Sequence, residues 1–346
     1  MDEARTLDSY LDSVTAGTPS LAAVAQTVRA LAKATLEIRA AVAAPSADHG
    51  HDAAVNPDGD LQKPLDVIAD EAILGHLRGA PVALYASEER ADPVALDPGA
   101  GLACAVDPLD GSSNLENAIS VGTIFTVLPC AAGDLDRPLA PFLRPGSTQL
   151  AAGFAVYGPR TVLALTLGQG THLFVHDPDL GAYRTLAQDR AVPERASEFA
   201  INASNYRHWD EQVRLYVDDC LKGAEGPRGR DFNMRWIASL VAEAYRILVR
   251  GGVFLYPADA RRGYANGRLR LVYEANPIAM LMEQAGGMAT NGTERILDIP
   301  PADLHQRVPL VFGSAREVAR IRRYHLDPSG IGERAPLFGH RSLFRA

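Results

Sequence analysis

The sequence is poor in cysteine and has no long apolar run. Its three cysteines, Cys104, Cys130 and Cys220, form no CxxC pair and have no histidines nearby at zinc-finger spacing. This excludes a disulfide framework and a Cys/His zinc site, so we expect three small core residues in a reducing compartment. No stretch approaches the roughly 18 consecutive apolar residues of a membrane span. We therefore expect no membrane partner.

The sequence also lacks clustered basic residues. The formal net charge is −8, and the lysines and arginines are scattered along the chain. This excludes the electrostatic footprint of a nucleic-acid-binding protein, so an anionic substrate would have to be held by local basic groups and metal ions. The first residues, MDEARTLDSY, are acidic and contain no apolar signal region. We expect a cytoplasmic protein.

The first half of the chain combines long helices with short buried strands. Apolar residues at helical spacing predict helices over 21–44 and 65–77. The segment between them, about 45–60, is rich in Pro, Gly and Asp and predicts a mobile loop. Six apolar runs predict strands, and the close spacing of the last three favours antiparallel pairing. These runs are 82–85, 102–106, 121–128, 150–157, 162–167 and 171–176.

The pattern changes past about residue 198, where helices and short strands alternate. The predicted helices are 208–222, 236–249 and 276–285, and the predicted strands are 253–256, 269–273 and 308–313. With 346 residues the chain can form two medium domains. We expect a mixed α/β (α+β) protein with an N-terminal domain, 1–198, and a C-terminal domain, 199–346.

Residues 107–114 read DPLDGSSN, and this run can supply both halves of a phosphatase site. Asp107 and Asp110 are hard oxygen ligands for a divalent cation. Gly111, Ser112 and Ser113 offer backbone N–H groups of the kind that bind phosphate at a helix N-terminus. An Asp-Pro-x-Asp-Gly run is also a common turn. The hypothesis is metal-assisted phosphate ester chemistry.

Two further carboxylates, Glu88 and Glu89, stand where the strand VALYAS ends. Asp107 takes the same place after LACAV. If the two strands are neighbours in one sheet, Glu88, Glu89 and Asp107 come together with Asp110, four carboxylates in all. Such a cluster is tolerable only if divalent cations neutralise it, and all-oxygen ligation favours Mg²⁺ or Mn²⁺ over zinc. An isolated SEE is more often a solvated strand end, but its coincidence with DPLDGSSN favours metal ligands.

Four further strings accompany DPLDGSSN: SVGTIF at 120–125 and, in the C-terminal half, GGVFLYPAD at 251–259, GRLRLVYEANPIAMLMEQAGGMAT at 267–290 and LHQRVPLVFGS at 304–314. With these strings the chain resembles the class I fructose-1,6-bisphosphatases, within the lithium-sensitive sugar and inositol phosphatases. Inositol monophosphatases share the metal motif but lack the C-terminal strings. The resemblance implies a layered αβαβα fold with two sheets and helices between and outside them. It also implies a homotetramer and Mg²⁺-dependent hydrolysis of the 1-phosphate of fructose 1,6-bisphosphate.

The same resemblance implies the metal ligands and the residues that activate water. The ligands would be Glu88, Glu89, Asp107, Asp110, Glu274 and the main-chain carbonyl of Leu109. Glu274, in LVYEANP, would follow a strand and bring a fifth carboxylate across the interdomain cleft. Without the resemblance it would be assigned as an acid flanking a helix. Asp66, in QKPLDVIAD, would act with Glu89 on the attacking water, although Asp66 could equally cap a helix.

The distal phosphate of a bisphosphate would need its own binding groups. The resemblance implies Asn202, Tyr206, Arg235 and Tyr256, with Arg235 reaching into the neighbouring subunit's site. A planar guanidinium and tyrosine hydroxyls suit phosphate. Taken singly, the two tyrosines are more often core aromatics and the arginine a surface charge.

Two substrate positions depart from the family pattern. Trp236 stands where the family commonly has a phosphate-binding tyrosine, and Arg268 where a lysine commonly meets the sugar. An indole has an N–H but no hydroxyl, and arginine and lysine are not interchangeable. Sedoheptulose 1,7-bisphosphate is therefore an alternative substrate. An inositol monophosphatase and a non-catalytic sugar-phosphate sensor are less favoured alternatives.

Regulation by AMP is not expected. Family members that AMP inhibits use a lysine–tyrosine pair and an arginine at positions that read Gly101, Leu102 and Pro129 here. None of these three side chains can pair with a phosphate through charge. We predict weak or absent AMP inhibition.

Overall fold

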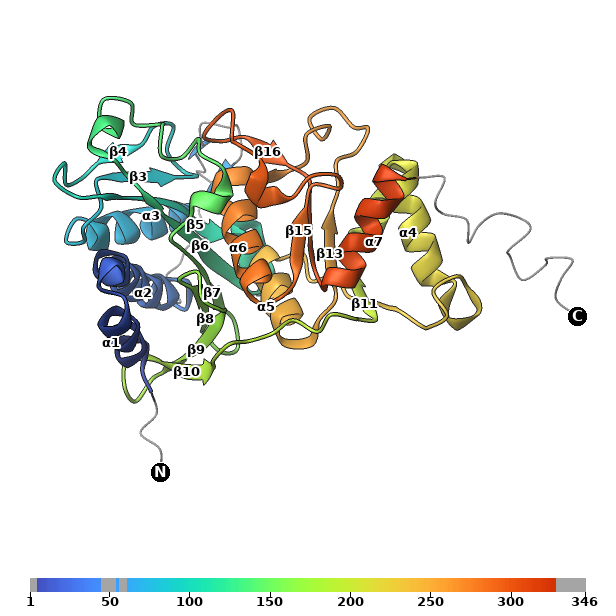
Figure 1. The fold of residues 1–346 in the computed structure, drawn as a ribbon, viewed down its shortest axis with the longest axis horizontal. Coiled ribbons are helices and arrows are strands. Elements are labelled where there is room, and N and C mark those ends of the chain that lie inside the picture. The colour runs from blue at the N-terminus through green and yellow to red at the C-terminus, as the bar shows by residue number, and fades with distance from the viewer. Residues whose placement is uncertain (1–4, 45–53, 56–60, 328–346) are drawn as a thin grey trace, which may run out of the picture.

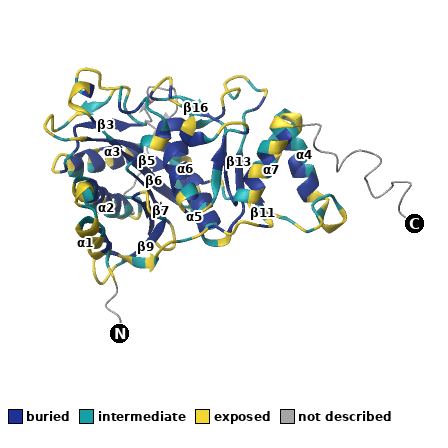
Figure 2. Cartoon of the chain, in the orientation of Figure 1, coloured by how far each residue is buried: buried dark blue, intermediate teal, exposed yellow. Residues whose placement is uncertain are grey.

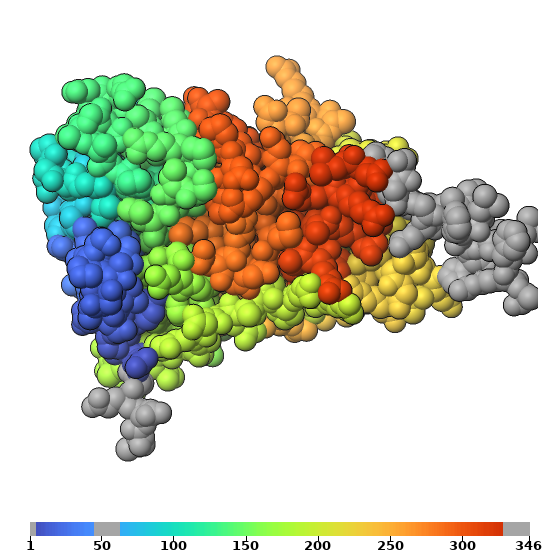
Figure 3. All heavy atoms as spheres, viewed as in Figure 1, coloured from blue at the N-terminus to red at the C-terminus, as the bar shows by residue number. Residues whose placement is uncertain are grey.

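The computed structural model describes residues 5–44, 54–55 and 61–327. Layers of helices and sheets alternate along the long axis, in the order helix, sheet, helix, sheet, helix (Figure 1). In the space-filling view the N-terminal helices (blue) lie on the left, and the residues of α7 (red) and α4 (yellow) lie on the right (Figure 3). The αβαβα fold is thus confirmed. Of the predicted mobile loop, 45–60, only Ala54–Val55 (β1) is described, paired with Leu61–Gln62 (β2).

The first sheet has eight strands in the order β10-β9-β8-β7-β6-β5-β3-β4. Neighbours are antiparallel except β3 and β5, which are parallel. All six predicted strands are present with small shifts of their ends, and β4 and β10 are additional. The bounds are β3 Leu84–Ser87, β4 Val94–Ala95, β5 Leu102–Asp110, β6 Val121–Pro129, β7 Ala151–Tyr157, β8 Val162–Thr166, β9 His172–Asp177 and β10 Ala182–Ala187.

The outer helical layer on this sheet consists of α1 (Leu7–Gly17), α2 (Ala22–Val42) and α3 (Pro64–Leu77) (Figure 1). Helices α2 and α3 are the two that the apolar spacing predicts. A 3-10 turn, η1 (Pro19–Leu21), precedes α2. Because helices cover both faces of the sheet, β5 to β8 are buried along almost their whole length.

The middle layer consists of α5 (Leu240–Arg250) and α6 (Asn276–Gln284). Both helices contact strands of both sheets. Residues 276–282 of α6 are all buried, as expected for a helix that is apolar on every side. Figure 2 shows this layer and the two sheets as the buried part of the molecule, with exposed faces on the outer helices.

The second sheet has five strands in the order β12-β11-β13-β17-β15, and α4 (Glu211–Leu221) and α7 (Ala315–Leu326) cover its outer face (Figure 1). Strand β11 runs parallel to β12 and β13, and the other pairs are antiparallel. The sequence pattern does not predict α7. The bounds are β11 Glu198–Ala200, β12 Asn233–Met234, β13 Val253–Tyr256, β15 Met288–Thr290 and β17 Leu310–Gly313.

The predicted strand 269–273 is wrong beyond its first two residues. Only β14 (Leu269–Arg270) is extended, and it pairs with β16 (Arg307–Val308) in a separate ribbon. The chain then forms a π-helix, η7 (Leu271–Ala275), that runs directly into α6. Its residues are all buried, so an apolar run that fits a strand belongs to a buried helical turn.

The three cysteines are free and buried, which confirms their expected place in the core. Within the described ranges, no helix combines the length and apolarity needed to cross a membrane. The remaining short 3-10 helices are η2 Ser112–Asn117, η3 Ala132–Asp134, η4 Gly146–Thr148, η5 Ala203–His208, η6 Gly223–Glu225 and η8 Ile296–Asp298.

Candidate active site

A cavity of about 740 Å³ is lined by residues from both sheets and from α3. It gathers fourteen of the sixteen residues that the sequence analysis names for the site. Tyr206 and Arg235 are not among its lining residues. The fourteen are Asp66, Glu88, Glu89, Asp107, Leu109, Asp110, Gly111, Ser112, Ser113, Asn202, Trp236, Tyr256, Arg268 and Glu274.

A β-bulge brings Asp107 and Asp110 together. The predicted strand end before Asp107 is wrong, because β5 continues to Asp110. Asp107 pairs with Ile124 and Asp110 with Gly122, so three steps on β5 match two steps on β6. In a regular strand, residues three apart point to opposite faces, and one extra residue returns them to the same side. Proline suits such a bulge because it has no N–H to donate.

Three carboxylates meet at this bulge. One oxygen from each of Asp107, Asp110 and Glu274 lies within 4.8 Å of the others, and all three residues are buried. Burial, together with the neighbouring carboxylates, raises the pKa of Asp107 and Glu274 well above the usual range and that of Asp110 to about 7. A cluster that resists ionisation this strongly fits a divalent cation, whose charge would hold the carboxylates ionised.

Glu88 and Glu89 join this cluster from the neighbouring strand. Strand β3 ends at Ser87 and runs parallel to β5, so both strands deliver acids at one edge of the sheet. Both glutamates contribute to the raised pKa of Asp107. The buried Arg270 guanidinium lies 3.3 Å from Glu88 (Nε to Oε1) and partly offsets the negative charge.

Glu274 reaches the cluster from η7 rather than from a strand end. Its carboxylate accepts a hydrogen bond from the backbone N–H of Arg270. π-Helical turns are rare and recur at functional sites, where they re-aim side chains. The fifth carboxylate therefore comes from the second half of the chain, as predicted, but on a helical turn.

Helix α5 packs closely against the bulge. The Val241 N–H donates to Asp110 Oδ2 at 3.1 Å, which ties the first turn of α5 to a candidate metal ligand. This contact needs Gly122, since a Cβ there would lie 2.1 Å from the Ala155 carbonyl and 2.7 Å from a Val241 methyl. The glycine of SVGTIF thus allows α5 to approach β6.

Asp66 lies at the start of α3 and faces the cavity. Its Oδ2 accepts the Lys63 N–H at 2.7 Å, so it does cap the helix, and Ser112 Oγ lies 3.4 Å away. Its buried Oδ1 accepts no hydrogen bond from the described residues. Burial raises the pKa of Asp66 despite these donors. One carboxylate thus both caps α3 and lines the cavity.

The GSS turn follows the bulge directly. Gly111 has φ of 75°, a left-handed conformation that glycine adopts without strain, and it precedes η2. Asn114 Nδ2 donates to the Ala238 carbonyl at 2.7 Å. The turn is therefore fastened to the loop before α5.

The opposite end of the cavity is aromatic and basic. Trp236 stacks on Phe254 with ring centroids 5.9 Å apart and an interplanar angle of 11°, and it lies 6.2 Å from Tyr256. The Arg268 guanidinium lies 4.7 Å from the Tyr264 ring centroid. Together with Asn202, these side chains offer N–H and O–H donors and positive charge.

Two predicted substrate contacts lie outside this cavity. Tyr206, on η5, donates its hydroxyl to Asp218 at 2.9 Å and packs on Trp209. Arg235 is 53% exposed, and its Nε lies 3.7 Å from Glu198. A single chain therefore brings together only part of the predicted distal phosphate site.

The three positions connected with AMP are close in space. Leu102 on β5 pairs directly with Pro129 on β6, and Gly101 comes just before. None of these three residues carries a charged side chain. Weak or absent AMP inhibition remains a prediction.

The sequence analysis missed three basic residues that line the cavity: Lys63, Arg270 and Arg307. Each lies within or beside a string already identified, in QKPLD, RLRLVYE and HQRV. The excess of acids in the motif was a usable signal, because buried carboxylates need nearby cations. Which arginines meet them depends on the fold.

The layered fold, with a carboxylate cluster at one end of the cavity and a basic, aromatic wall at the other, is typical of metal-dependent sugar phosphatases. Residues 12–188 match the family described as Fructose-1-6-bisphosphatase, N-terminal domain, and residues 192–326 match its C-terminal domain. The chain therefore belongs to the class 1 fructose-1,6-bisphosphatase family.

Individual relatives agree with this family. The chain is 62% identical to the class 1 fructose-1,6-bisphosphatase of Rhizobium meliloti (strain 1021), over 99% of both chains. It is 52% identical to that of Rhodopseudomonas palustris (strain HaA2), over the whole of both. Among solved structures, the holo form of Leishmania major fructose-1,6-bisphosphatase matches with a TM-score of 0.86 and 32% identity, covering 93% of this chain and 99% of that one.

Proposed function

We propose that this protein hydrolyses the 1-phosphate of fructose 1,6-bisphosphate to give fructose 6-phosphate and phosphate. The observation that carries the proposal is a single cavity with five carboxylates at one end and Asn202, Trp236, Tyr256 and Arg268 at the other. The first end suits metal-assisted attack on one phosphate. The second end suits the binding of another.

The family is metal-dependent, and we propose Mg²⁺, with Mn²⁺ as a substitute, at two or three positions. The ligands would be Glu88, Glu89, Asp107, Asp110 and Glu274 with the Leu109 carbonyl, an all-oxygen set. The mutual proximity and raised pKa values of Asp107, Asp110 and Glu274 support it. When bound, the cation would polarise the phosphoryl oxygens and acidify the attacking water.

In this proposal Asp66 and Glu89 accept the proton of the attacking water. The raised pKa of Asp66 moves it toward the working range of a general base. The backbone N–H groups of Gly111, Ser112 and Ser113 hold the transferring phosphate and stabilise its developing charge. Hydrolysis by water needs no covalent phosphoenzyme.

The 6-phosphate would be bound at the aromatic end, by Asn202, Tyr256 and Arg268 with the Trp236 indole N–H. We further propose a homotetramer in which Arg235 enters the neighbouring subunit's site, since its side chain is half exposed and outside its own cavity. To bind the phosphate, the Tyr206 hydroxyl would have to give up its hydrogen bond to Asp218.

We also propose two domains, an N-terminal domain of residues 1–198 and a C-terminal domain of residues 199–346. The first sheet ends at Ala187 and the second begins at Glu198. In this division the proposed metal ligands, except Glu274, would lie in the first domain. The distal phosphate site belongs to the second, so substrate would span the two.

Sedoheptulose 1,7-bisphosphate is the second candidate substrate. Trp236 and Arg268 keep it a candidate, because both line the cavity and differ from the side chains that the family commonly has there. A longer sugar would present its distal phosphate to the same donors with a different geometry.

The test is phosphate release by the purified protein with Mg²⁺ from three substrates: fructose 1,6-bisphosphate, sedoheptulose 1,7-bisphosphate and inositol 1-phosphate. We expect kcat/KM to be highest for fructose 1,6-bisphosphate. A ranking led by inositol 1-phosphate would overturn the proposal. No phosphate release from any of them would favour a sugar-phosphate sensor.

A further inference from the structure

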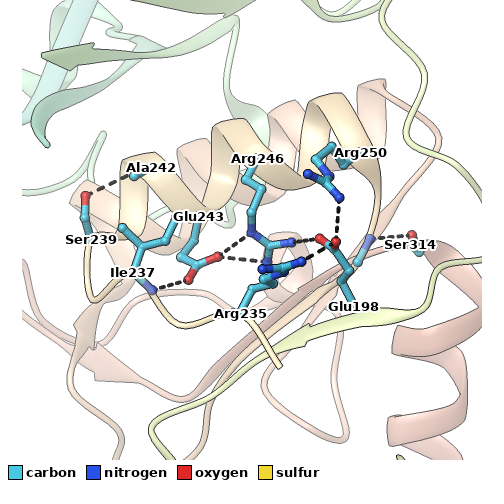
Figure 4. Close-up of polar contacts among 10 residues, drawn as sticks. Glu198, Arg235, Ile237, Ser239, Ala242, Glu243, Arg246, Arg250 and Ser314 are labelled. Atoms are coloured by element: carbon cyan, nitrogen blue, oxygen red, sulfur yellow. Dashed lines mark hydrogen bonds and ion pairs between the residues drawn. The ribbon is translucent and has the colours of Figure 1, made fainter. Parts of the chain in front are cut away.

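A cluster of charged residues lies beside the segment 235–239, which connects β12 to α5 (Figure 4). Its members are Glu198, Arg235, Glu243, Arg246 and Arg250. This segment carries Arg235 and Trp236, and it includes Ala238, which has a left-handed φ of 62°. A non-glycine residue in that conformation is strained and persists only where its surroundings hold it. The segment therefore depends on its anchors.

One anchor comes from the metal end of the cavity. Asn114, in the DPLDGSSN run, donates to the Ala238 carbonyl at 2.7 Å. The next residue, Ser239, begins α5, and the Val241 N–H binds Asp110. These contacts hold the second half of the segment against the first sheet.

The other anchor is Glu243, a fully buried acid on α5. Its Oε1 accepts the Ile237 N–H at 2.8 Å, and its Oε2 accepts from Arg246 Nε at 3.0 Å (Figure 4). Ile237 directly follows Trp236, so this carboxylate fixes the backbone next to the aromatic wall. A buried carboxylate remains ionised only with a cationic partner, and Arg246 is that partner.

Arg246 extends the connection to the second sheet. Its Nη1 lies 2.6 Å from Glu198 Oε2, and both side chains are 12% exposed. Glu198 opens β11, the strand that leads to Asn202 in the cavity. One guanidinium thus joins the segment beside Trp236 to the strand before Asn202.

The arrangement leaves Arg235 loosely held. Glu198 Oε1 accepts from Arg250 Nη2 at 2.8 Å, whereas Arg235 Nε lies 3.7 Å from the same oxygen. Because Arg246 and Arg250 already satisfy Glu198, the exposed Arg235 guanidinium keeps donors for another anion. The cluster has three arginines and two glutamates, which leaves one positive charge in excess.

We propose that Glu243 and Arg246 are positioning residues for the distal phosphate. They touch neither the cavity nor substrate, but they hold the backbone at Ile237 and the strand at Glu198, and so set Arg235, Trp236 and Asn202. The inference rests on the proposed function, in which these three bind the 6-phosphate. Loss of Arg246 should therefore weaken binding of substrates that have that phosphate and spare those that lack it.

The test compares Arg246→Gln with two further variants on fructose 1,6-bisphosphate and fructose 1-phosphate. Arg235→Gln tests the distal phosphate site itself. Arg144→Gln is the matched control, because Arg144 also pairs with a buried acid, Asp134 at 2.7 Å, but lies outside the cavity. We expect Arg246→Gln to raise KM for the bisphosphate on the order of 10-fold, with kcat changed much less and kcat/KM for fructose 1-phosphate nearly constant. Arg144→Gln should leave both substrates unaffected.

The outcomes separate the two claims. If Arg235→Gln impairs hydrolysis of the bisphosphate alone while Arg246→Gln does not, the inference is overturned. An equal loss of kcat/KM on both substrates in Arg246→Gln also overturns it. If Arg235→Gln itself shows no selectivity, the assignment of the distal site fails, and the inference fails with it. Should Arg246→Gln not fold, Arg246→Lys keeps the charge but cannot bridge both glutamates, and the same criterion applies to it.

Discussion

The two ends of the cavity are built in opposite ways. The metal end packs like charges together: Asp107, Asp110 and Glu274 are buried within 4.8 Å of one another. The distal end is assembled from aromatic rings and single basic groups, such as Trp236 stacked on Phe254. The first arrangement is costly without a cation, whereas stacked rings are favourable without one. The difference indicates that the metal end depends on a bound cation to offset its charge, whereas the distal end does not.

The largest expected effect is at the metal end. Asp110→Asn removes one ligand and one negative charge while keeping an oxygen that can accept from Val241. We expect kcat to fall by at least ~10²-fold, the usual scale for lost charge stabilisation at a reacting phosphate. Steady-state phosphate release with saturating Mg²⁺ measures it. Retained activity would mean that the metal assignment is wrong.

Without metal, the repulsion between the clustered carboxylates should make the stability of the protein depend on pH. The pKa of Asp110, raised to about 7, lies above its unfolded value, so the metal-free fold loses stability as pH rises through about 7. We expect Mg²⁺ to raise Tm by several degrees at pH 8 and by much less at pH 5.5. Thermal unfolding with chelator and with Mg²⁺ at both pH values tests this.

Asp110→Asn provides the control for that experiment. With one carboxylate fewer, the metal-free variant should lose less Tm between the two pH values than the parent protein does. An equal loss in both proteins would place the pH dependence elsewhere in the molecule.

At the distal end the expected effects are smaller and fall on KM. Tyr256→Phe removes a hydroxyl from the cavity, and we expect KM for fructose 1,6-bisphosphate to rise by roughly 10-fold, the scale of one hydrogen bond to a charged group. Tyr206→Phe is the comparison variant: its hydroxyl binds Asp218 outside the cavity, so KM should change less than in Tyr256→Phe. A larger effect for Tyr206 than for Tyr256 would reverse the assignment.

The smallest effect is expected for Trp236→Tyr. The change keeps an aromatic ring against Phe254 and exchanges an N–H donor for an O–H donor, so KM should change by about 2-fold to 3-fold. Kinetics on the fructose and sedoheptulose bisphosphates would measure it. A loss of more than 10-fold for only one sugar would identify the indole as a specificity contact.

The metal end could be largely predicted because its residues stand close together in sequence. Asp107 and Asp110 share one run. Glu88 directly follows β3, and β3 pairs with β5, which carries both aspartates. What the sequence did not reveal was the backbone geometry. The bulge that turns both aspartates the same way, and the π-helical turn that carries Glu274, depend on packing against β6 and α6.

The distal end was less predictable for a physical reason. Asn202, Trp236 and Tyr256 come from three separate segments, and their convergence depends on how the second sheet is ordered. Arg270 was missed because an arginine in an apolar run is ordinarily a surface residue, whereas here it is buried against Glu88. The fold class itself followed from the helix and strand pattern with the family resemblance.

The most direct test of the two-ended cavity is the position of the phosphate that is lost. A ³¹P NMR time course with fructose 1,6-bisphosphate and Mg²⁺ distinguishes the two monophosphate products. Attack at the carboxylate end, with the 6-phosphate held by the aromatic end, predicts fructose 6-phosphate and inorganic phosphate in equal amounts. Accumulation of fructose 1-phosphate would contradict the account.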